Sequence, residues 1–130
     1  MGQWDVLEND ASILDDEWLY RGILEEWLVQ DRTRPSSLAF VINRSDPHIS
    51  VDRGTLTTPD KTKARLSRNV AVAQLQAKSA RDVTIGVASK PKPDNPAHAL
   101  IIRDLSLAKP EWKRRARKLA RSCSWAIGPS

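Results

Sequence analysis

The chain has 130 residues, of which 40% are hydrophobic and 28% are charged. This composition is typical of one globular domain, too short for two separate cores, and it excludes an intrinsically disordered chain. No uncharged apolar run approaches the ~20 residues of a membrane-spanning helix, and the N-terminus lacks the pattern of a signal peptide, so we expect a cytoplasmic protein that does not enter a membrane.

The net charge of +5 conceals opposite charges in the two parts of the chain. Residues 1–40 carry nine acidic and three basic side chains, whereas residues 41–130 carry seven acidic and eighteen basic ones. Three interpretations stay open: a basic surface for nucleic acid, head-to-tail self-association, or mutual neutralisation when both parts fold together.

The N-terminal third of the chain predicts an arm followed by strands. Residues 1–14 show no period and are expected to form an N-terminal arm in front of a single α+β domain, residues 15–130. Residues 18–22 alternate in polarity and predict the first strand, whereas residues 23–29 are ambiguous.

Residues 37–42 form the clearest predicted strand, and residues 48–52 return as a second strand of a β-hairpin. In this hairpin, side-chain alternation places Ser37, Ser50 and Asp52 together on the face opposite the core.

The remaining chain predicts helices at both ends of a group of strands. Thr58 and Pro59 are typical of a helix start, and this helix is expected to end near Ser67. Strands are expected at 70–75, 83–87 and 97–102, with a short helix at 78–82 and an irregular, proline-rich stretch at 90–96.

The last predicted helix runs from Pro110 to about Cys123 and is the most strongly amphipathic segment. Its apolar stripe comprises Trp112, Ala116, Leu119, Ala120 and Cys123. The fold class predicted from all these elements is α+β, with a small, mostly antiparallel sheet within residues 18–102 packed against a long C-terminal helix.

Four polar residues inside apolar segments are the candidate catalytic residues: Arg21, Ser37, Asp52 and His98. A buried arginine needs partners, and we expect Arg21 to lie within direct or water-bridged reach of Asp52 or of the pair Ser36 and Ser37. The alternative is a purely structural arginine that pairs with Asp52 or with a cluster of backbone carbonyls. Its planar guanidinium also suits a phosphate or carboxylate, so Arg21, Ser36 and Ser37 are candidate anion-binding residues.

His98 is either a buried, hydrogen-bonded residue or a general base. We expect it to be at least half buried and hydrogen-bonded through one nitrogen. His48, after Pro47, is expected to be exposed. The two histidines do not have the spacing of a metal site, so neither a metal nor a cofactor is predicted.

The polar face of the last predicted helix is rich in basic residues that could contact a nucleic-acid backbone. The candidates are Lys113, Arg114, Arg117, Lys118 and Arg121. The alternative is a solvated face, neutralised in part by acidic residues between positions 15 and 26. Cys123, the only cysteine, excludes an internal disulfide and is expected to behave as a small buried hydrophobic residue.

Four spaced motifs resemble a family of short, uncharacterised bacterial proteins. They are Leu-Tyr-Arg at 19–21, Pro-Ser-Ser-Leu-Ala-Phe at 35–40, Ser-Val-Asp at 50–52 and Pro-Ala-His-Ala at 96–99. The resemblance covers roughly residues 18–102 and implies a bacterial, self-standing small domain without an established activity.

A weaker likeness links the segment at residues 19–22 to ADP-ribosyltransferase-type domains, in which an arginine in such a strand holds the dinucleotide phosphates. Ser36, Ser37 or Ser50 would then correspond to the serine of a later strand. The catalytic acid of those domains has no counterpart on a later strand, because the only glutamate after residue 26 is Glu111 at a helix start. This difference argues against that activity.

We therefore expect a non-enzymatic binding or interaction module of a bacterial cytoplasmic system. A protein partner, self-association and nucleic acid are all compatible with the charges. The alternative is a small enzyme that acts on a nucleotide or nucleic acid through the cluster of Arg21, Ser37, Asp52 and His98.

Overall fold

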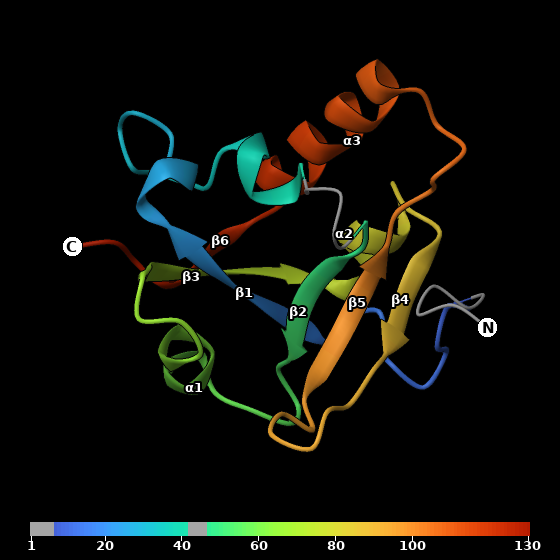
Figure 1. Ribbon diagram of the computed structural model, residues 1–130, viewed down its shortest axis with the longest axis horizontal. Coiled ribbons are helices and arrows are strands. Elements are labelled where there is room, and N and C mark those ends of the chain that lie inside the picture. The colour runs from blue at the N-terminus through green and yellow to red at the C-terminus, as the bar shows by residue number, and fades with distance from the viewer. Residues whose placement is uncertain (1–6, 42–46) are drawn as a thin grey trace.

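The structure, a computed structural model, describes residues 7–41 and 47–130 and has an α+β fold (Figure 1). Its six-stranded sheet has the order β4-β5-β2-β1-β3-β6, and every neighbouring pair is antiparallel. The strands are β1 (Trp18–Leu24), β2 (Ile49–Arg53), β3 (Asn69–Gln76), β4 (Gly86–Ser89), β5 (His98–Ile102) and β6 (Ser124–Ile127).

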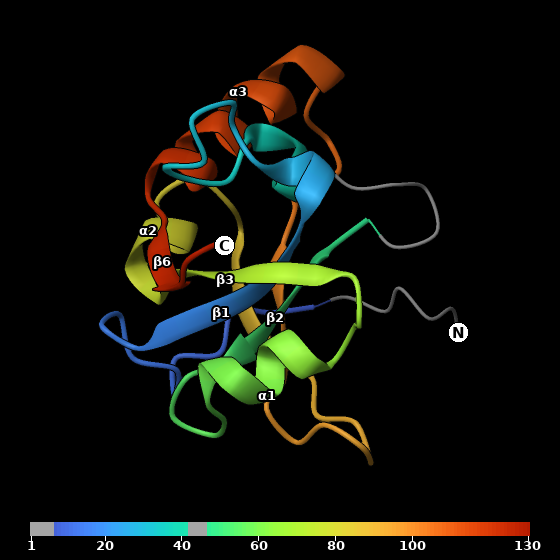
Figure 2. The ribbon, with the colours of Figure 1, turned by 90° about the vertical axis from the view of Figure 1, so that its left-hand side faces the viewer.

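Helices cover both faces of this sheet. They are α1 (Pro59–Ala64), α2 (Ala77–Arg81) and α3 (Lys109–Arg121), and two 3-10 turns, η1 (Glu25–Trp27) and η2 (Ser37–Phe40), connect β1 to β2. Figure 2 shows α3 and η2 on one side of the central strands and α1 on the opposite side. No helix within the described ranges is long and apolar enough to cross a bilayer.

The hydrophobic core lies between one face of the sheet and the layer formed by α2, α3 and η2. Alternate residues of β2 and β5 enter this core, and Trp112 and Leu119 of α3 are almost fully buried in it. The apolar stripe predicted for the last helix is therefore confirmed. The alternation leaves Ser50, Asp52 and His98 on the other face of the sheet, the face that α1 covers only in part.

Several predicted elements are confirmed because local signals define them. The Thr58 hydroxyl accepts a hydrogen bond from the Lys61 backbone N–H and Pro59 occupies the first turn, as expected for the start of α1. The strand predicted at 70–75 is β3, the short helix predicted at 78–82 is α2, and the strand predicted at 97–102 is β5.

The β-hairpin predicted for residues 37–52 is wrong. Residues 37–40 form η2, in which the Ser36 hydroxyl accepts a hydrogen bond from the Leu38 N–H, and β2 pairs with β1 and β5 instead. As a strand, Leu38 and Phe40 would share a face, but Leu38 is 55% exposed and Phe40 is buried against the core. Ile42 lies outside the described residues.

The C-terminal part of the predicted fold also needs correction. The sheet is not confined to residues 18–102, because β6 follows α3 in the chain, pairs with β3 and forms one edge of the sheet. With 13 residues, α3 is of ordinary length, and Cys123 lies two positions beyond its end. The strand expected at 83–87 begins only at Gly86.

The described part of the N-terminal segment is held against β4 and α2. Ile13 is fully buried, and the Asp10 backbone N–H donates to the Val87 carbonyl at 2.8 Å. The Arg81 guanidinium of α2 donates to the backbone carbonyls of Asp10 and Ile13 and forms an ion pair with Asp15. Trp4, which the sequence suggests as a contact of the arm, lies outside the described residues.

Candidate functional site

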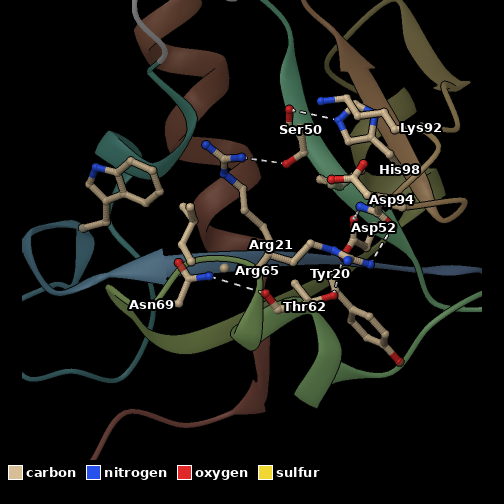
Figure 3. A pocket seen from close by; sticks show the side chains of 15 residues that line it. Tyr20, Arg21, Ser50, Asp52, Thr62, Arg65, Asn69, Lys92, Asp94 and His98 are labelled. Atoms are coloured by element: carbon tan, nitrogen blue, oxygen red, sulfur yellow. Dashed lines mark hydrogen bonds and ion pairs between the residues drawn. The ribbon is translucent and has the colours of Figure 1, made fainter.

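A cavity of about 340 Å³ lies where β1 and β2 separate. The two strands pair only at Leu19 with Arg53 and Tyr20 with Asp52, whereas β1 continues its pairing with β3 up to Leu24. Side chains of β1, β2, β5, α1 and the loop before β5 line this cavity (Figure 3). Its lining residues are Tyr20, Arg21, Gly22, Trp27, Ser50, Val51, Asp52, Thr62, Arg65, Leu66, Asn69, Lys92, Asp94, Asn95 and His98.

Arg21 joins the separated strands at the inner side of this cavity. Its Nε donates to the Ala39 carbonyl of η2 at 2.8 Å, and its Nη1 donates to the Ser50 carbonyl of β2 at 2.6 Å. The guanidinium carbon also lies 5.1 Å from the centroid of the Trp27 ring, within the range of a cation–π contact. These two hydrogen bonds match the alternative interpretation, in which Arg21 is held by backbone carbonyls.

Asp52 forms its ion pair with Arg65, a residue that the sequence did not suggest. The Asp52 side chain is only 7% exposed, and Arg65 Nε donates to its Oδ2 at 3.0 Å. Thr62 Oγ1 donates to the same oxygen at 2.7 Å, and Asn95 Nδ2 donates to Oδ1 at 2.8 Å. Burial alone would raise the pKa of Asp52, but the hydrogen bonds from Asn95, Thr62 and Arg65 outweigh it and hold this pKa below its ordinary value of 3.8.

Asn95 closes this network into a ring. Its Oδ1 accepts hydrogen bonds from Arg65 Nη2 at 2.6 Å and from the Ala97 backbone N–H at 3.2 Å. These two contacts determine which amide atom faces each partner, so the Asn95 nitrogen must point toward Asp52. The ring ties the loop before β5 to β2 and α1 and therefore shapes one wall of the cavity.

His98 is buried, as predicted, and both of its ring nitrogens have partners. Nδ1 lies 2.8 Å from the Lys90 carbonyl, and Nε2 lies 3.3 Å from Ser50 Oγ. A carbonyl oxygen can only accept, so Nδ1 must carry a proton. In the neutral ring Nε2 is then the acceptor, and the Ser50 hydroxyl donates to it.

The cavity has a wall that is partly aromatic and apolar and a rim that carries charged side chains. Tyr20, Trp27 and Leu66 contribute aromatic and apolar surface. Lys92 and Asp94 stand exposed at the rim, and Arg65, one third exposed, adds a second cation beside its own carboxylate partner. An apolar wall with a few convergent polar groups is the usual composition of a small-molecule site.

The structure brings together three of the four candidate catalytic residues. Arg21, Asp52 and His98 line the cavity, whereas Ser36 and Ser37 belong to η2 and its cap, outside the lining. The serine beside His98 is Ser50, which the sequence analysis placed on the same face as Asp52 but did not include among the candidate catalytic residues. Arg65 and Thr62 were missed because they belong to α1 and its C-terminal end, whereas the sequence signals describe only where this helix begins.

The candidate nucleic-acid residues lie on the other side of the molecule, on α3. The basic face of α3, defined here as Lys113, Arg114, Arg117, Lys118 and Arg121, is exposed throughout. Glu111 pairs with Arg114 and Arg115, whose hydrogen bonds lower the pKa of this partly exposed carboxyl to about 2.

Acidic residues of the first forty positions form ion pairs with basic residues outside α3. Glu17 pairs with Arg53, Glu26 with Arg68 and Asp15 with Arg81. These contacts support mutual neutralisation of the two parts of the chain. Among the described residues, however, no ion pair joins the acidic segment to the basic face of α3.

The other residues that could take part in chemistry, His48 and Cys123, lie outside the cavity. His48 is buried rather than exposed, and its Nδ1 accepts a hydrogen bond from the Arg103 backbone N–H at 3.2 Å. Burial raises the pKa of the Cys123 thiol to about 12, which makes it a poor nucleophile. Within the described ranges, no three His, Cys, Asp or Glu side chains are arranged to hold a metal ion.

No protein-family model, curated protein or solved structure matches this chain. The likenesses that the sequence motifs suggest therefore stay predictions, and the cavity has to be interpreted from its own geometry.

Proposed function

We propose that the cavity binds a small molecule that combines a planar group with an anionic group, and that a nucleotide is the first class to test. The observation that carries this proposal is the convergence of Arg21, Asp52 and His98 with Ser50 in one cavity lined in part by aromatic side chains. Convergence of such groups is what the enzyme interpretation of the sequence requires, whereas a module that acts only through its surface does not need it.

The distribution of groups suggests how the ligand would lie. A planar ring fits against the Trp27 and Tyr20 side of the cavity, since aromatic stacking tolerates many ring types. The anionic group would face Lys92 and the exposed part of Arg65, while Asp94 keeps the rim from becoming strongly positive. This balance favours a monoanionic or dianionic ligand over a polyphosphate.

The two histidines provide a test with an internal control. His98 lines the cavity, whereas His48 is buried at the opposite end of β2, four residues from Asp52, the residue that pairs with His98. In a titration with nucleoside monophosphates, the imidazole NMR signals of His98 should shift saturably and those of His48 should not. Lys92→Ala should weaken the binding several-fold, and Lys61→Ala, at an exposed lysine of α1 outside the lining, should leave it unchanged.

Two outcomes would contradict this proposal. One is the absence of any His98 shift at millimolar nucleoside monophosphate. The other is equal shifts of both histidines, which would indicate a nonspecific effect of the added anion. Binding of the nucleoside without its phosphate, with unchanged affinity, would retain the cavity as a site but refute the anionic part of the assignment.

A second candidate function is supported by the basic face of α3. Arg114 is paired with Glu111, but among the described residues no ion pair joins the other exposed cations of this face, Lys113, Arg117, Lys118 and Arg121, to an acidic side chain. These four cations therefore stay available for phosphates. We propose that this face contacts a nucleic-acid backbone without reading its sequence.

The salt dependence of binding tests this second proposal. If about four phosphates are neutralised, the logarithm of the affinity for a short duplex should fall with the logarithm of salt concentration with a slope of about −3 to −4. The double variant Arg117→Glu, Lys118→Glu should abolish binding. The charge-matched double variant Lys61→Glu, Lys63→Glu on α1 should retain most of it, and absence of binding at low salt would refute the proposal.

A further inference from the structure

Ser50 and His98 have the arrangement of a nucleophile beside its base. Ser50 Oγ lies 3.3 Å from His98 Nε2, a distance slightly longer than a tight hydrogen bond and common for such pairs before a substrate is bound. Both side chains line the cavity, so a ligand held there would lie within reach of the serine hydroxyl.

The surroundings of His98 fix the ring in the state that this chemistry needs. The Lys90 carbonyl, 2.8 Å from Nδ1, accepts a hydrogen bond from the Nδ1–H, which leaves the Nε2 lone pair facing Ser50. The same carbonyl would stabilise the charged ring that forms when Nε2 takes up a proton. The Lys90 carbonyl thus takes the orienting position that a carboxylate holds in many serine hydrolases.

The backbone of Ser50 is also held in place. The Ser50 carbonyl accepts a hydrogen bond from Arg21, and Ser50 is paired with Leu100 of the neighbouring strand β5. A hydroxyl on a restrained strand residue loses little further freedom when it reacts, which is the condition under which positioning contributes to rate. Ser37, the serine that the sequence favoured, lies outside this cavity.

We propose that Ser50 and His98 form a nucleophile–base pair that hydrolyses an acyl ester carried by the ligand of this cavity. This inference rests on the proposed function for the location of the ligand but adds its reactive group. Ser50 Oγ bonds to the ester carbonyl carbon while its proton moves to His98 Nε2. The carbon–oxygen bond to the alcohol then breaks, and the same proton passes to the departing alkoxide.

Water completes the cycle. A water oxygen bonds to the acyl carbon as its proton moves to Nε2, and the bond from that carbon to Ser50 Oγ then breaks. The proton returns to Ser50, and the carboxylic acid leaves. No oxidant, metal or further reactant is needed to balance these steps.

A fluorophosphonate reagent tests this pair without knowledge of the ligand, because it phosphonylates an activated serine and releases fluoride. We expect the full chain to gain one adduct, which peptide mapping places on Ser50. Ser50→Ala should lose the adduct, and His98→Gln should slow its formation by about 100-fold or more, the usual contribution of a general base. Ser37→Ala is the matched control and should be labelled at the unchanged rate.

A second variant covers the case in which His98→Gln does not fold. In Ser50→Cys, the new thiol beside His98 should react with iodoacetamide much faster than the thiol of Ser37→Cys, which lies at another partly buried position outside the cavity and has no such base beside it. The inference is overturned if Ser50 gains no adduct in the folded wild-type chain. It is equally overturned if the thiol introduced by Ser50→Cys reacts no faster than the one introduced by Ser37→Cys.

The two proposals fail separately. If nucleotides shift the His98 signals but Ser50 is unreactive, the cavity binds without this chemistry. If Ser50 is labelled but nucleotides do not bind, the reactive pair is retained and the assigned class of ligand is wrong.

Discussion

Replacing Asp52 by asparagine tests whether the ring of Asp52, Arg65 and Asn95 stabilises the fold. Asparagine has the same shape, but one of its two terminal atoms is a donor. Whichever way the new amide turns, that donor meets either Asn95 Nδ2 or Arg65 Nε. Asn95 cannot relieve the conflict by turning its own amide, because its Oδ1 already accepts from Arg65 and from the Ala97 N–H.

The expected cost follows from the contacts that change. The variant loses one charge-assisted hydrogen bond and leaves one donor unpaired in a site where the carboxylate is 7% exposed. Each effect costs about 1–3 kcal/mol, but Arg65 is one third exposed and can recover water contacts. We therefore expect Asp52→Asn to lower the free energy of unfolding by about 2–3 kcal/mol, equivalent to a fall in Tm of roughly 6–12 °C.

Urea denaturation at several pH values provides the measurement. The pKa of Asp52 is lower in the folded than in the unfolded chain, so its contribution to stability is fully present above the unfolded pKa of about 4 and is lost as pH falls through the folded pKa. The difference between wild type and variant should thus be constant from pH 7 to about 5 and should shrink below about pH 4. Glu17, whose pKa is also lowered, is present in both proteins and cancels in this difference.

Asp94→Asn is the matched control, because Asp94 is an exposed acid at the rim of the same cavity and should change stability by no more than about 0.5 kcal/mol. A difference below about 0.5 kcal/mol between wild type and Asp52→Asn at pH 7 would refute the stabilising role of the ring. So would a larger difference that stays constant down to about pH 2, since the carboxylate charge would then not be its source.

Three further predictions concern the core, a close contact and the cysteine. Trp112→Ala should lower the free energy of unfolding by about 3–5 kcal/mol in urea denaturation, because Trp112 is only 1% exposed; a loss below about 1 kcal/mol would contradict its role in anchoring α3. Gly22→Ala should cost about 1–3 kcal/mol, since the added Cβ would collide with the Asn69 side chain, whereas Gly128→Ala, with its nearest neighbour 4.0 Å away, should be nearly neutral. Iodoacetamide should modify Cys123 slowly in the native chain at pH 8 and rapidly in denaturant, and equal rates would show that the fold does not protect this thiol.

Elements with local signals could be predicted from the sequence. The hydroxyl of Thr58 and the ring of Pro59 act within one turn of α1, so the start of that helix needs no distant partner. The apolar stripe containing Trp112 and Leu119 likewise defines the buried side of α3. The burial of His98 followed from its position in an apolar segment, although its hydrogen-bond partners did not.

The segment at residues 37–42 shows where local pattern fails. Its apolar residues suit a strand or a short helical turn equally well, and periodicity cannot distinguish the two over so few residues. The choice depends on contacts made elsewhere: Phe40 packs in the core that includes α3, and the Ala39 carbonyl accepts a hydrogen bond from Arg21. These contacts exist only after residues far apart in the chain have come together.

The sequence by itself determined the α+β class, the start of α1 at its capping residue Thr58, and the polar residues worth considering for a site. Tertiary structure decided which of those residues meet. Asp52 forms hydrogen bonds with Arg65 and Asn95, which are 13 and 43 positions away in the sequence. The pairing of β2 with β5 and the packing of α1 bring these residues together. Local signals act over a few residues, whereas strand register and helix packing depend on the whole core, and the cavity is built by the latter.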